Sequence, residues 1–350
     1  MLMNTTKIKE RIGHLLIMVM SVLLLELKYS EQPPLIRTLY GVVVTFLVIM
    51  QYALFRKHKL VVLGSLFLIR EPNIFFVLST SDVAIIAYVL LELRRLKLKL
   101  SIFKEPLDVR DIYLETLENA ARCIFVSRAL LEKAKSFGYS GQNATVIPNG
   151  YDPDVFKPMD KNTVRKELGI YKENTHYVGF VGNLIPIKRA DKLPEIFRKI
   201  AKELPNTRFL IVGDGALRDK ILKEMKGLDV VFAGRVPQVE VAKYMNAMDV
   251  MVLPSRNEGW PCVILEAQAC GTCVIGSSNG GIPEAIGFEK YVVQEGDKFE
   301  ERFGKRVVEV LREGYDMNRL MERAKGFTWV KVVERETELY EQIIQAFRRD

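Results

Sequence analysis

Histidine and cysteine are scarce in this sequence, which has three His and four Cys among 350 residues. No paired cluster of the two residue types completes a zinc site, and four cysteines in a chain of this length do not make the disulfide framework of a small secreted domain. Cys270 and Cys273 have the spacing of a redox motif, but they lie where an expected helix ends and runs into a strand. We therefore expect a buried pair of thiols there.

Apolar runs long enough to span a bilayer are also missing. Residues 39–55 contain no charged residue, but they fall just short of the ~20 residues that a transmembrane helix needs, and they include Thr45 and Gln51. We expect a buried or interfacial helix. A helix that spans the bilayer stays the alternative, because the basic flank at residues 56–59 is typical of a cytoplasmic anchor. The apolar run at residues 15–25 lacks the small-residue cleavage site of a signal peptide, so it predicts a first buried strand.

Positive charge is unevenly distributed. The net charge is +8, with 19 Lys/Arg against 12 Asp/Glu in residues 1–150 and 32 against 31 in the remainder. The basic N-terminal half is suited to an anionic membrane surface or an acidic acceptor. No aromatic-interleaved basic stripe or nucleic-acid motif is present, so we do not expect a nucleic-acid partner.

Strand and helix patterns alternate along the chain, whose length allows two domains and whose 49% hydrophobic and 27% charged residues are typical of globular proteins. This alternation predicts an α/β fold with parallel, doubly wound sheets. In the first half we expect strands at 60–69, 74–78, 98–103, 123–126 and 144–147, and helices at 81–95, 112–121 and 128–137. In the second half we expect strands at 176–182, 208–212, 229–233, 250–253, 273–276 and 291–293, and helices at 190–203, 216–226, 238–247, 263–270, 282–287 and 327–347.

Residues 147–156 (I-P-N-G-Y-D-P-D-V-F) have the composition of a domain boundary. Their Asp152-Pro153-Asp154 matches the Asp-x-Asp of some metal-dependent transferases, but in this linker we expect a turn. Gly213 and Gly215 form only a fragment of a dinucleotide fingerprint, because Lys220 stands where a third glycine would be sought.

The most informative stretch runs from Ser255 to Ala267. A buried strand is expected to end just before it, and a turn containing Gly259 then leads into a helix. Such a turn directs backbone N–H groups and the positive end of a helix at one point, which makes an anion site suited to a diphosphate. Glu258 and Glu266 bracket this site, and their carboxylates can accept hydrogen bonds from sugar hydroxyls. The stretch therefore predicts a site for a nucleotide-sugar.

Motifs in order over residues 120–340 resemble those of the family-4-type retaining glycosyltransferases of the GT-B fold (glycosyl transferases group 1). They are Glu-x7-Glu within S-R-N-E-G-W-P-C-V-I-L-E-A-Q-A-C-G at 255–271, and G-G-I-P-E at 280–284. The resemblance implies two Rossmann-like domains with a cleft between them. Their ranges would be an acceptor-side domain at 1–150, a donor-binding domain at 151–330, and a C-terminal helix at 331–350 that packs back on the first domain. It also implies retaining transfer of a hexose from a nucleotide-diphosphate sugar to a hydroxyl acceptor, a sugar or a lipid-linked sugar.

The turn G-N-L-I-P-I-K at 182–188 resembles the family's G-R-L-x-P-x-K, whose Arg and Lys hold the phosphates. Lys188 keeps its place, Asn183 replaces the Arg without a charge, and Arg189, where many relatives have Gly, could partly compensate. By resemblance, Lys188 and Glu258 are catalytic, at the diphosphate and the donor sugar, and Glu266 binds the ribose. The other donor-binding residues that the resemblance implies are Asn183, Arg189, Gly213, Asp214, Arg235, Val236, Gly259, Trp260, Pro261, Cys262 and Val263. A cationic turn paired with a helix dipole can replace Mg²⁺, so we expect no metal and no other cofactor.

The first domain departs from the family. Residues 28–34 (K-Y-S-E-Q-P-P) stand in place of a glycine-rich loop, and no histidine follows a matching strand. Arg110 and Asp111 occupy a region where the family often has His-Asp, so they are either acceptor-side contacts or a helix N-cap and a solvated charge. Two other functions stay open: a catalytically weak donor-binding subunit of a glycosyltransferase complex, and a GT-B nucleotide-sugar epimerase or phosphorylase. The expected location is the cytoplasm, including the cytoplasmic face of a membrane.

Overall fold

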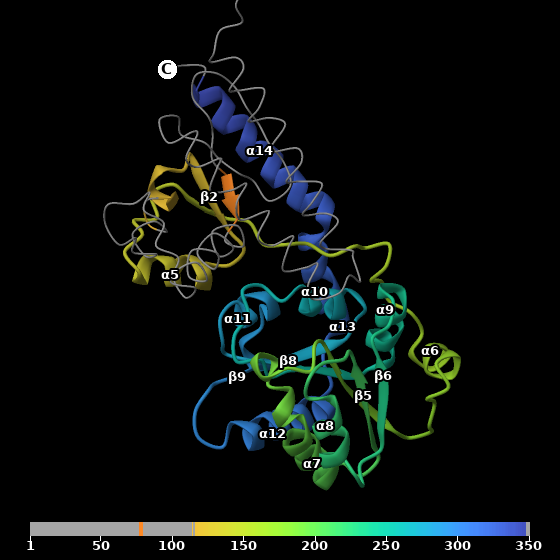
Figure 1. Cartoon of the computed structure of the whole chain (residues 1–350). Coiled ribbons are helices and arrows are strands. Elements are labelled where there is room, and N and C mark those ends of the chain that lie inside the picture. Colours follow the sequence, from red (N-terminus) through yellow and green to blue (C-terminus); the bar gives the residue numbers. More distant parts are fainter. Residues whose placement is uncertain (1–76, 80–113, 115, 348–350) are drawn as a thin grey trace, which may run out of the picture. The chain divides into compact units, whose positions relative to one another are not determined.

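The structure is a computed structural model that describes residues 77–79, 114 and 116–347 (Figure 1). These residues fall into two compact units. The first holds the described residues up to 124 together with 134–145, and the second holds 125–133 and 146–347. The border between the units therefore lies at 124/125, 133/134 and 145/146, inside two strands and one helix. The predicted domain ranges stay a prediction.

A short sheet with the strand order β1-β2-β3 begins the described part of the chain. Its strands are Val77–Ser79, Arg122–Phe125 and Ala144–Val146. β1 and β2 run parallel, and α5 (Arg128–Ser136) follows β2. The strands expected at 123–126 and 144–147 and the helix expected at 128–137 are confirmed. The expectations for 15–25, 39–55, 60–69, 81–95 and 98–103 lie outside the described residues.

The second unit is built on a six-stranded parallel sheet with the order β6-β5-β4-β7-β8-β9. The strands are β4 (His176–Val181), β5 (Thr207–Val212), β6 (Val230–Gly234), β7 (Val250–Leu253), β8 (Cys273–Ser277) and β9 (Val292–Val293). All four residues of β7 and all five of β8 are buried, as expected for central strands covered on both faces. This confirms the doubly wound α/β prediction for the second half of the chain.

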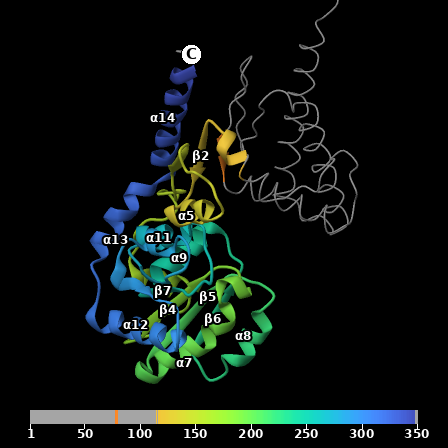
Figure 2. The same ribbon diagram turned by 90° about the vertical axis from the view of Figure 1, so that its left-hand side faces the viewer.

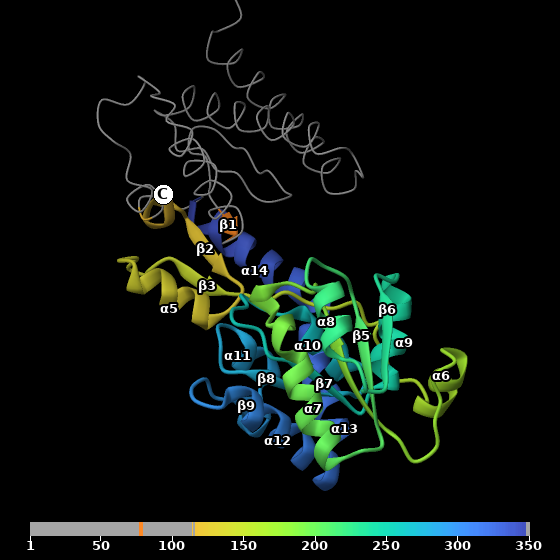
Figure 3. The ribbon, with the colours of Figure 1, turned by 60° about the horizontal axis from the view of Figure 1, so that its bottom comes forward.

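Helices cover both faces of this sheet (Figures 1 and 2). One layer contains α7 (Leu193–Glu203), α8 (Arg218–Glu224) and α12 (Phe299–Glu313). The other contains α9 (Gln238–Ala247), α10 (Cys262–Ala269), α11 (Ile282–Ile286) and α13 (Met317–Ala324). Figure 3 shows α7 and α8 over the strands. In α7, Leu193, Ile196, Phe197 and Ile200 are buried at the i, i+3, i+4, i+7 spacing that a helix on a sheet requires.

The sequence missed three helices of the second unit. α6 (Lys161–Glu167) is capped by Asp160, whose carboxylate accepts from the Thr163 N–H at 2.8 Å. α12 and α13 were also not expected, although Phe299, Phe303, Val307 and Val310 show the helical spacing. The helix expected at 190–203 begins as a 3-10 turn, η2 (Ala190–Lys192), and becomes α-helical only at α7. The final helix forms as α14 (Trp329–Phe347), and its packing on the first domain stays a prediction.

Two smaller expectations are also confirmed. The Asp152 carboxylate accepts from the Asp154 N–H at 2.9 Å, so Asp152-Pro153-Asp154 is an Asx turn. Cys270 and Cys273 are free and buried, and burial raises the pKa of each thiol to about 12. Among the described residues, no helix combines the length and the apolar character that are needed to cross a membrane.

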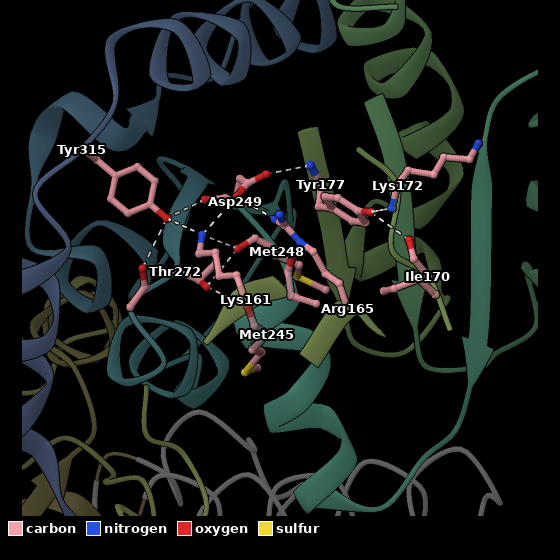
Figure 4. Close-up of polar contacts among 12 residues, drawn as sticks. Lys161, Arg165, Ile170, Lys172, Tyr177, Met245, Met248, Asp249, Thr272 and Tyr315 are labelled. Atoms are coloured by element: carbon pink, nitrogen blue, oxygen red, sulfur yellow. Dashed lines mark hydrogen bonds and ion pairs between the residues drawn. The ribbon is translucent and has the colours of Figure 1, made fainter. Parts of the chain in front are cut away.

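A charged cluster ties the amino ends of β4 and β7 together (Figure 4). The Asp249 carboxylate accepts from Lys161 Nζ at 3.1 Å, from Arg165 Nη2 at 2.8 Å and from the Tyr177 N–H at 2.9 Å. The Arg165 guanidinium lies 3.9 Å from the Tyr177 ring centre. The Tyr315 hydroxyl donates to the Asp249 carbonyl at 2.8 Å. Because its charges pair within it, the cluster is suited to holding the sheet together.

Replacing Asp249 by Ala should lower the free energy of unfolding by about 3 kcal/mol, because two partly buried cations lose their shared carboxylate. Burial lowers the pKa of Lys161, and Asp249 opposes that shift, so the loss of Asp249 leaves the ammonium without this anionic partner. The two tryptophans of the chain, Trp260 and Trp329, both lie in the second unit. Urea unfolding followed by their fluorescence therefore measures the effect.

Asp229→Ala is the matched control. Asp229 also pairs with two cations, Lys172 at 2.6 Å and Arg208 at 3.1 Å, but its side chain is 37% exposed. Its removal should therefore cost less than about 1 kcal/mol. Equal losses in the two variants would contradict a special contribution from the cluster around Asp249.

Candidate functional site

The order of the strands creates one place in the sheet where a ligand crevice is expected. β4 and β7 are neighbours, but the chain leaves β4 toward β5 and β6, and it leaves β7 toward β8 and β9. Loops that follow two such strands diverge, and ligands of open α/β sheets bind outside the carboxyl ends at this switch point. The segments that follow β4 and β7 are residues 182–192 and 254–261. They contain both predicted catalytic residues.

The carboxyl ends of β4, β5 and β6 approach one another closely. The Gly213 N–H donates to the Gly234 carbonyl at 2.8 Å, and the Leu184 N–H donates to the Asp214 carbonyl at 3.0 Å. A Cβ at Gly213, whose φ is 129°, would lie 2.0 Å from the Gly182 carbonyl oxygen, so only glycine fits there. This contact brings the predicted donor-binding residues that follow the three strands to one edge. They are Asn183, Gly213, Asp214, Arg235 and Val236, of which Asn183 and Arg235 are exposed.

Lys188 and Glu258 meet directly. The Lys188 Nζ lies 2.6 Å from a Glu258 carboxylate oxygen, with 26% and 11% of the two side chains exposed. Lys188 ends the 3-10 helix η1 (Pro186–Lys188), and Glu258 lies in the loop between β7 and α10. The structure thus places the predicted phosphate-binding cation against the predicted sugar-binding carboxylate.

A second pair fastens the same two segments. Both Nη atoms of Arg256 donate to the Asp191 carboxylate, at 2.8 and 2.9 Å, in the bidentate geometry typical of strong Arg–carboxylate pairs. This pairing holds the pKa of Asp191 below its ordinary value. The Arg256 N–H also donates to the Ile187 carbonyl at 2.8 Å. The sequence analysis missed Arg256 and Asp191, although Arg256 stands within the motif that carried the resemblance.

The start of α10 presents free backbone donors. Pro261 is its N-cap and supplies no side-chain hydrogen bond, and no acidic side chain lies in the first turn. Among the described residues, the N–H groups of Cys262 and Val263 have no protein acceptor, so they are suited to a ligand at the positive end of the helix. Trp260 anchors the loop that leads into α10, because its indole N–H donates to the Asn149 carbonyl at 3.0 Å. Burial raises the pKa of Cys262 to about 11, so its thiol carries no charge at neutral pH.

The G-G-I-P-E segment supports the loop that carries Glu258. The Gly281 N–H donates to the Glu258 carbonyl at 2.9 Å, and a Cβ at Gly281 would lie 2.0 Å from the Gly259 carbonyl oxygen. The Glu284 carboxylate accepts from the Arg128 and Ala129 N–H groups at 3.1 and 3.2 Å, and so caps α5. The segment therefore positions the loop and does not itself add a charge to the crevice.

Glu266 is a half-buried carboxylate on α10. Burial raises its pKa from the ordinary 4.5 to about 7. Among the described residues, the structure gives this carboxylate no hydrogen-bond donor and no cation. Such a group gains the most from a ligand that brings its own donors, as ribose hydroxyls would.

The remaining predicted site residues fall into two groups. Arg189 is buried, and its guanidinium pairs with Glu295 at 2.9 Å. Arg110 and Asp111, the expected acceptor-side contacts, lie outside the described residues. Nowhere in the described part of the chain do His, Cys, Asp or Glu side chains gather in threes in a way that could hold a metal ion.

The parallel six-stranded sheet, with helices on both faces, defines the class of the second unit as a Rossmann-like domain. Residues 175–313 match the family model described as glycosyl transferases group 1. The resemblance to glycosyl transferases group 1 is thus confirmed for these residues.

Curated relatives include the D-inositol 3-phosphate glycosyltransferase of Mycobacteroides abscessus, which is 31% identical over 58% of this chain and 47% of the relative. The N-acetyl-alpha-D-glucosaminyl L-malate synthase of Bacillus anthracis is 33% identical over 49% of this chain and 46% of the relative. The chain thus spans about half the length of these relatives or less.

Solved structures establish the fold. The sucrose-phosphate synthase of Thermosynechococcus elongatus superposes with a TM-score of 0.60 and 20% identity, covering 79% of this chain and 69% of that one. HepE of Anabaena in complex with UDP superposes with a TM-score of 0.61 and 19% identity, covering 76% and 78%. The chain has the GT-B fold, as expected from its motifs.

Glu266→Gln should be more stable than the wild type at pH 8 but not at pH 5. In the folded protein the Glu266 carboxyl keeps its proton up to about pH 7, against 4.5 for the ordinary carboxyl, so the wild type loses stability as the pH rises from 4.5 through 7. The difference at pH 8 should be on the order of 2 kcal/mol. Urea unfolding of both proteins at pH 5, 7 and 8 measures it. A difference that is constant with pH would contradict the raised pKa.

Proposed function

We propose that the protein is a glycosyltransferase that moves a hexose from a nucleotide-diphosphate sugar to a hydroxyl acceptor. The observation that carries the proposal is the contact between Lys188 and Glu258 at the switch point of a glycosyl transferases group 1 domain. A cation and a carboxylate in contact there offer one group for a diphosphate and one for sugar hydroxyls. The names of the relatives support this reading, since they include glycosyltransferases.

The proposed mechanism assigns the developing charge to fixed groups. As the glycosidic bond of the donor breaks, negative charge builds up on the leaving diphosphate, where Lys188 and the first N–H groups of α10 stabilise it without reorganising. Glu258 exchanges its bond to Lys188 for hydrogen bonds from the donor sugar. Glu266 accepts from the ribose hydroxyls, and the backbone at Gly234 and Arg235 contacts the base.

Several finer features belong to the same proposal. Retention at the anomeric carbon, which is typical of family-4-type enzymes, rests on the motif resemblance. Independence from metal ions is supported by the cation and the helix end at the diphosphate site. The acceptor contacts at Arg110 and Asp111, a peripheral membrane contact of the basic N-terminal half, and a location in the cytoplasm or on its membrane face rest on the sequence alone.

A panel of UDP-, GDP- and ADP-sugars tests the proposal. A donor that binds only the folded protein raises its melting temperature by mass action. We expect one nucleotide class to shift the temperature, and the same donor to be hydrolysed or to transfer its sugar to a hydroxyl acceptor. Donor binding without either reaction would favour the donor-binding subunit, and no shift with any donor would refute the proposal.

The Lys188–Glu258 ion pair predicts that both variants are slower, and that Glu258→Gln nevertheless binds the nucleoside diphosphate more tightly. Lys188→Ala should slow transfer about a hundredfold or more at saturating donor, because a lost transition-state charge contact costs on the order of 3 kcal/mol. Glu258→Gln should also slow transfer, yet it should bind the free nucleoside diphosphate more tightly, because Lys188 no longer has to leave a carboxylate. Steady-state kinetics and calorimetric titration with UDP, GDP or ADP measure the two effects.

Lys192→Ala is the control for these variants, because Lys192 belongs to the next turn and pairs with Glu195 at an exposed site. It should change neither rate nor nucleotide affinity by more than about twofold. Wild-type activity in Lys188→Ala would remove Lys188 from the reaction. Weaker nucleotide binding in Glu258→Gln would mean that Glu258 does not compete for Lys188.

Chelation of metal ions should leave the rate unchanged. Initial rates of transfer in excess EDTA should equal those with added Mg²⁺ or Mn²⁺, because Lys188 and α10 supply the positive charge that a metal would otherwise bring. An activity that EDTA abolishes and that metal restores would contradict the proposed mechanism.

A further inference from the structure

Arg189 follows Lys188 directly and has an unusual backbone conformation. Its φ of 52° and ψ of 32° place it in the left-handed region, where it ends η1 and begins η2. A non-glycine residue in the left-handed region lowers the free energy of unfolding by on the order of 1–2 kcal/mol. The direction in which Lys188 leaves the turn depends on this kink, so whatever holds Arg189 also sets the position of Lys188.

The Arg189 side chain is held on two sides. It is 8% exposed, its Nη2 lies 2.9 Å from the Glu295 carboxylate, and its guanidinium lies 4.0 Å from the centre of the Phe299 ring. Phe299 is itself buried at the start of α12. The guanidinium therefore contacts two elements: the segment that follows β9, through Glu295, and the start of α12, through Phe299.

Glu295 is fixed in turn. Its carboxylate accepts from Asn279 Nδ2 at 2.6 Å, and its N–H donates to Ser278 Oγ at 3.1 Å. Asn279 Nδ2 also donates to the Ser255 carbonyl at 3.1 Å. A hydrogen-bonded chain therefore runs from Arg189, next to Lys188, to Ser255, three residues before Glu258. It connects the two segments that carry the catalytic pair.

Stability alone does not explain an arginine at this position. In the described part of the chain, the two buried side-chain polar atoms without a hydrogen-bond partner are Arg189 Nη1 and Ser255 Oγ, one at each end of the chain of contacts. A buried polar group without a partner is destabilising, and a glycine would adopt the left-handed conformation freely. Residues that lower stability in this way concentrate at functional sites.

We propose that Arg189 is a positioning residue, which through Glu295 holds the turn so that Lys188 reaches the leaving diphosphate. This inference rests on the proposed function and gives Arg189 a different role from the phosphate contact that the sequence suggested. Arg189 acts through Lys188 and touches no substrate. The segment that follows β9, far from the motifs, thereby becomes part of the support of the site.

The test is a double-mutant cycle on the full chain. Arg189→Gly keeps the left-handed turn and removes the side chain, and it should lower kcat about tenfold while KM for the donor changes less than about threefold. In the Lys188→Ala background, Arg189→Gly should lower kcat almost no further, because the Lys188 side chain that Arg189 positions is absent. Glu295→Gln should lower kcat in the same way, and Arg189→Lys, which can keep the pair with Glu295, should restore most of it.

Arg165→Ala is the matched control for a buried arginine. Arg165 is also 8% exposed, pairs with Asp249 and lies over the Tyr177 ring, but at the opposite edge of the sheet. It should lower the melting temperature and leave kcat of the folded protein unchanged. If Arg165→Ala lowered kcat as much as Arg189→Gly does, the effect would reflect stability alone and the proposal would be wrong.

Three other outcomes overturn the inference. They are additive effects of Arg189→Gly and Lys188→Ala, tighter binding of UDP, GDP or ADP by Glu295→Gln, and an unchanged kcat in Arg189→Gly. The first two would make Arg189 a direct phosphate contact. Failure of the proposed function is separate, since the wild type itself would then neither transfer a sugar nor shift its melting temperature with any nucleotide-sugar.

Discussion

The adjacency of β4 and β7 in one parallel sheet is the constraint on which the candidate site depends. Because the chain turns away in opposite directions after these strands, their following loops leave an open edge. Lys188 and Glu258 are seventy positions apart in sequence, yet they meet there at 2.6 Å. The bidentate pair of Arg256 and Asp191 fixes the same two loops, so the distance between the catalytic candidates follows from the strand order together with one strong ion pair.

Polar groups are paired to different extents at the two edges of the sheet. At the amino edge, Asp249 pairs with Lys161 and Arg165 within one cluster. At the carboxyl edge, Glu266 has no partner among the described residues, and burial raises its pKa to about 7. Arg189 Nη1 also lacks a partner there. Unmet hydrogen-bonding capacity reduces the stability of the free protein. At Glu266 it is recovered when a ligand brings hydrogen-bond donors, whereas at Arg189 it is a cost of holding the turn.

The glycines of the site act through the backbone. Gly213 permits the end of β5 to touch the end of β4, and Gly281 permits the carbonyl of Gly259 to approach to a distance that a Cβ would block. Glu284, three residues after Gly281, uses its carboxylate to cap α5. The motifs that carried the family resemblance thus combine two kinds of residue: those placed toward a ligand, and those that allow the loops to pack closely enough to place them.

The sequence by itself determined the α/β fold of the second half, most of its strands, the turn that leads from β7 into α10, and the choice of Lys188 and Glu258 as candidates. These features are recorded in short patterns, because strand periodicity and turn chemistry depend on neighbours along the chain. It did not reveal α12 and α13, the clamp from Arg256 to Asp191, or the burial that sets the pKa of Glu266. Only the tertiary structure decided that Arg189 is engaged by Glu295, a residue more than a hundred positions away. Such pairs depend on which loops the strand order brings together, and no local pattern contains that order.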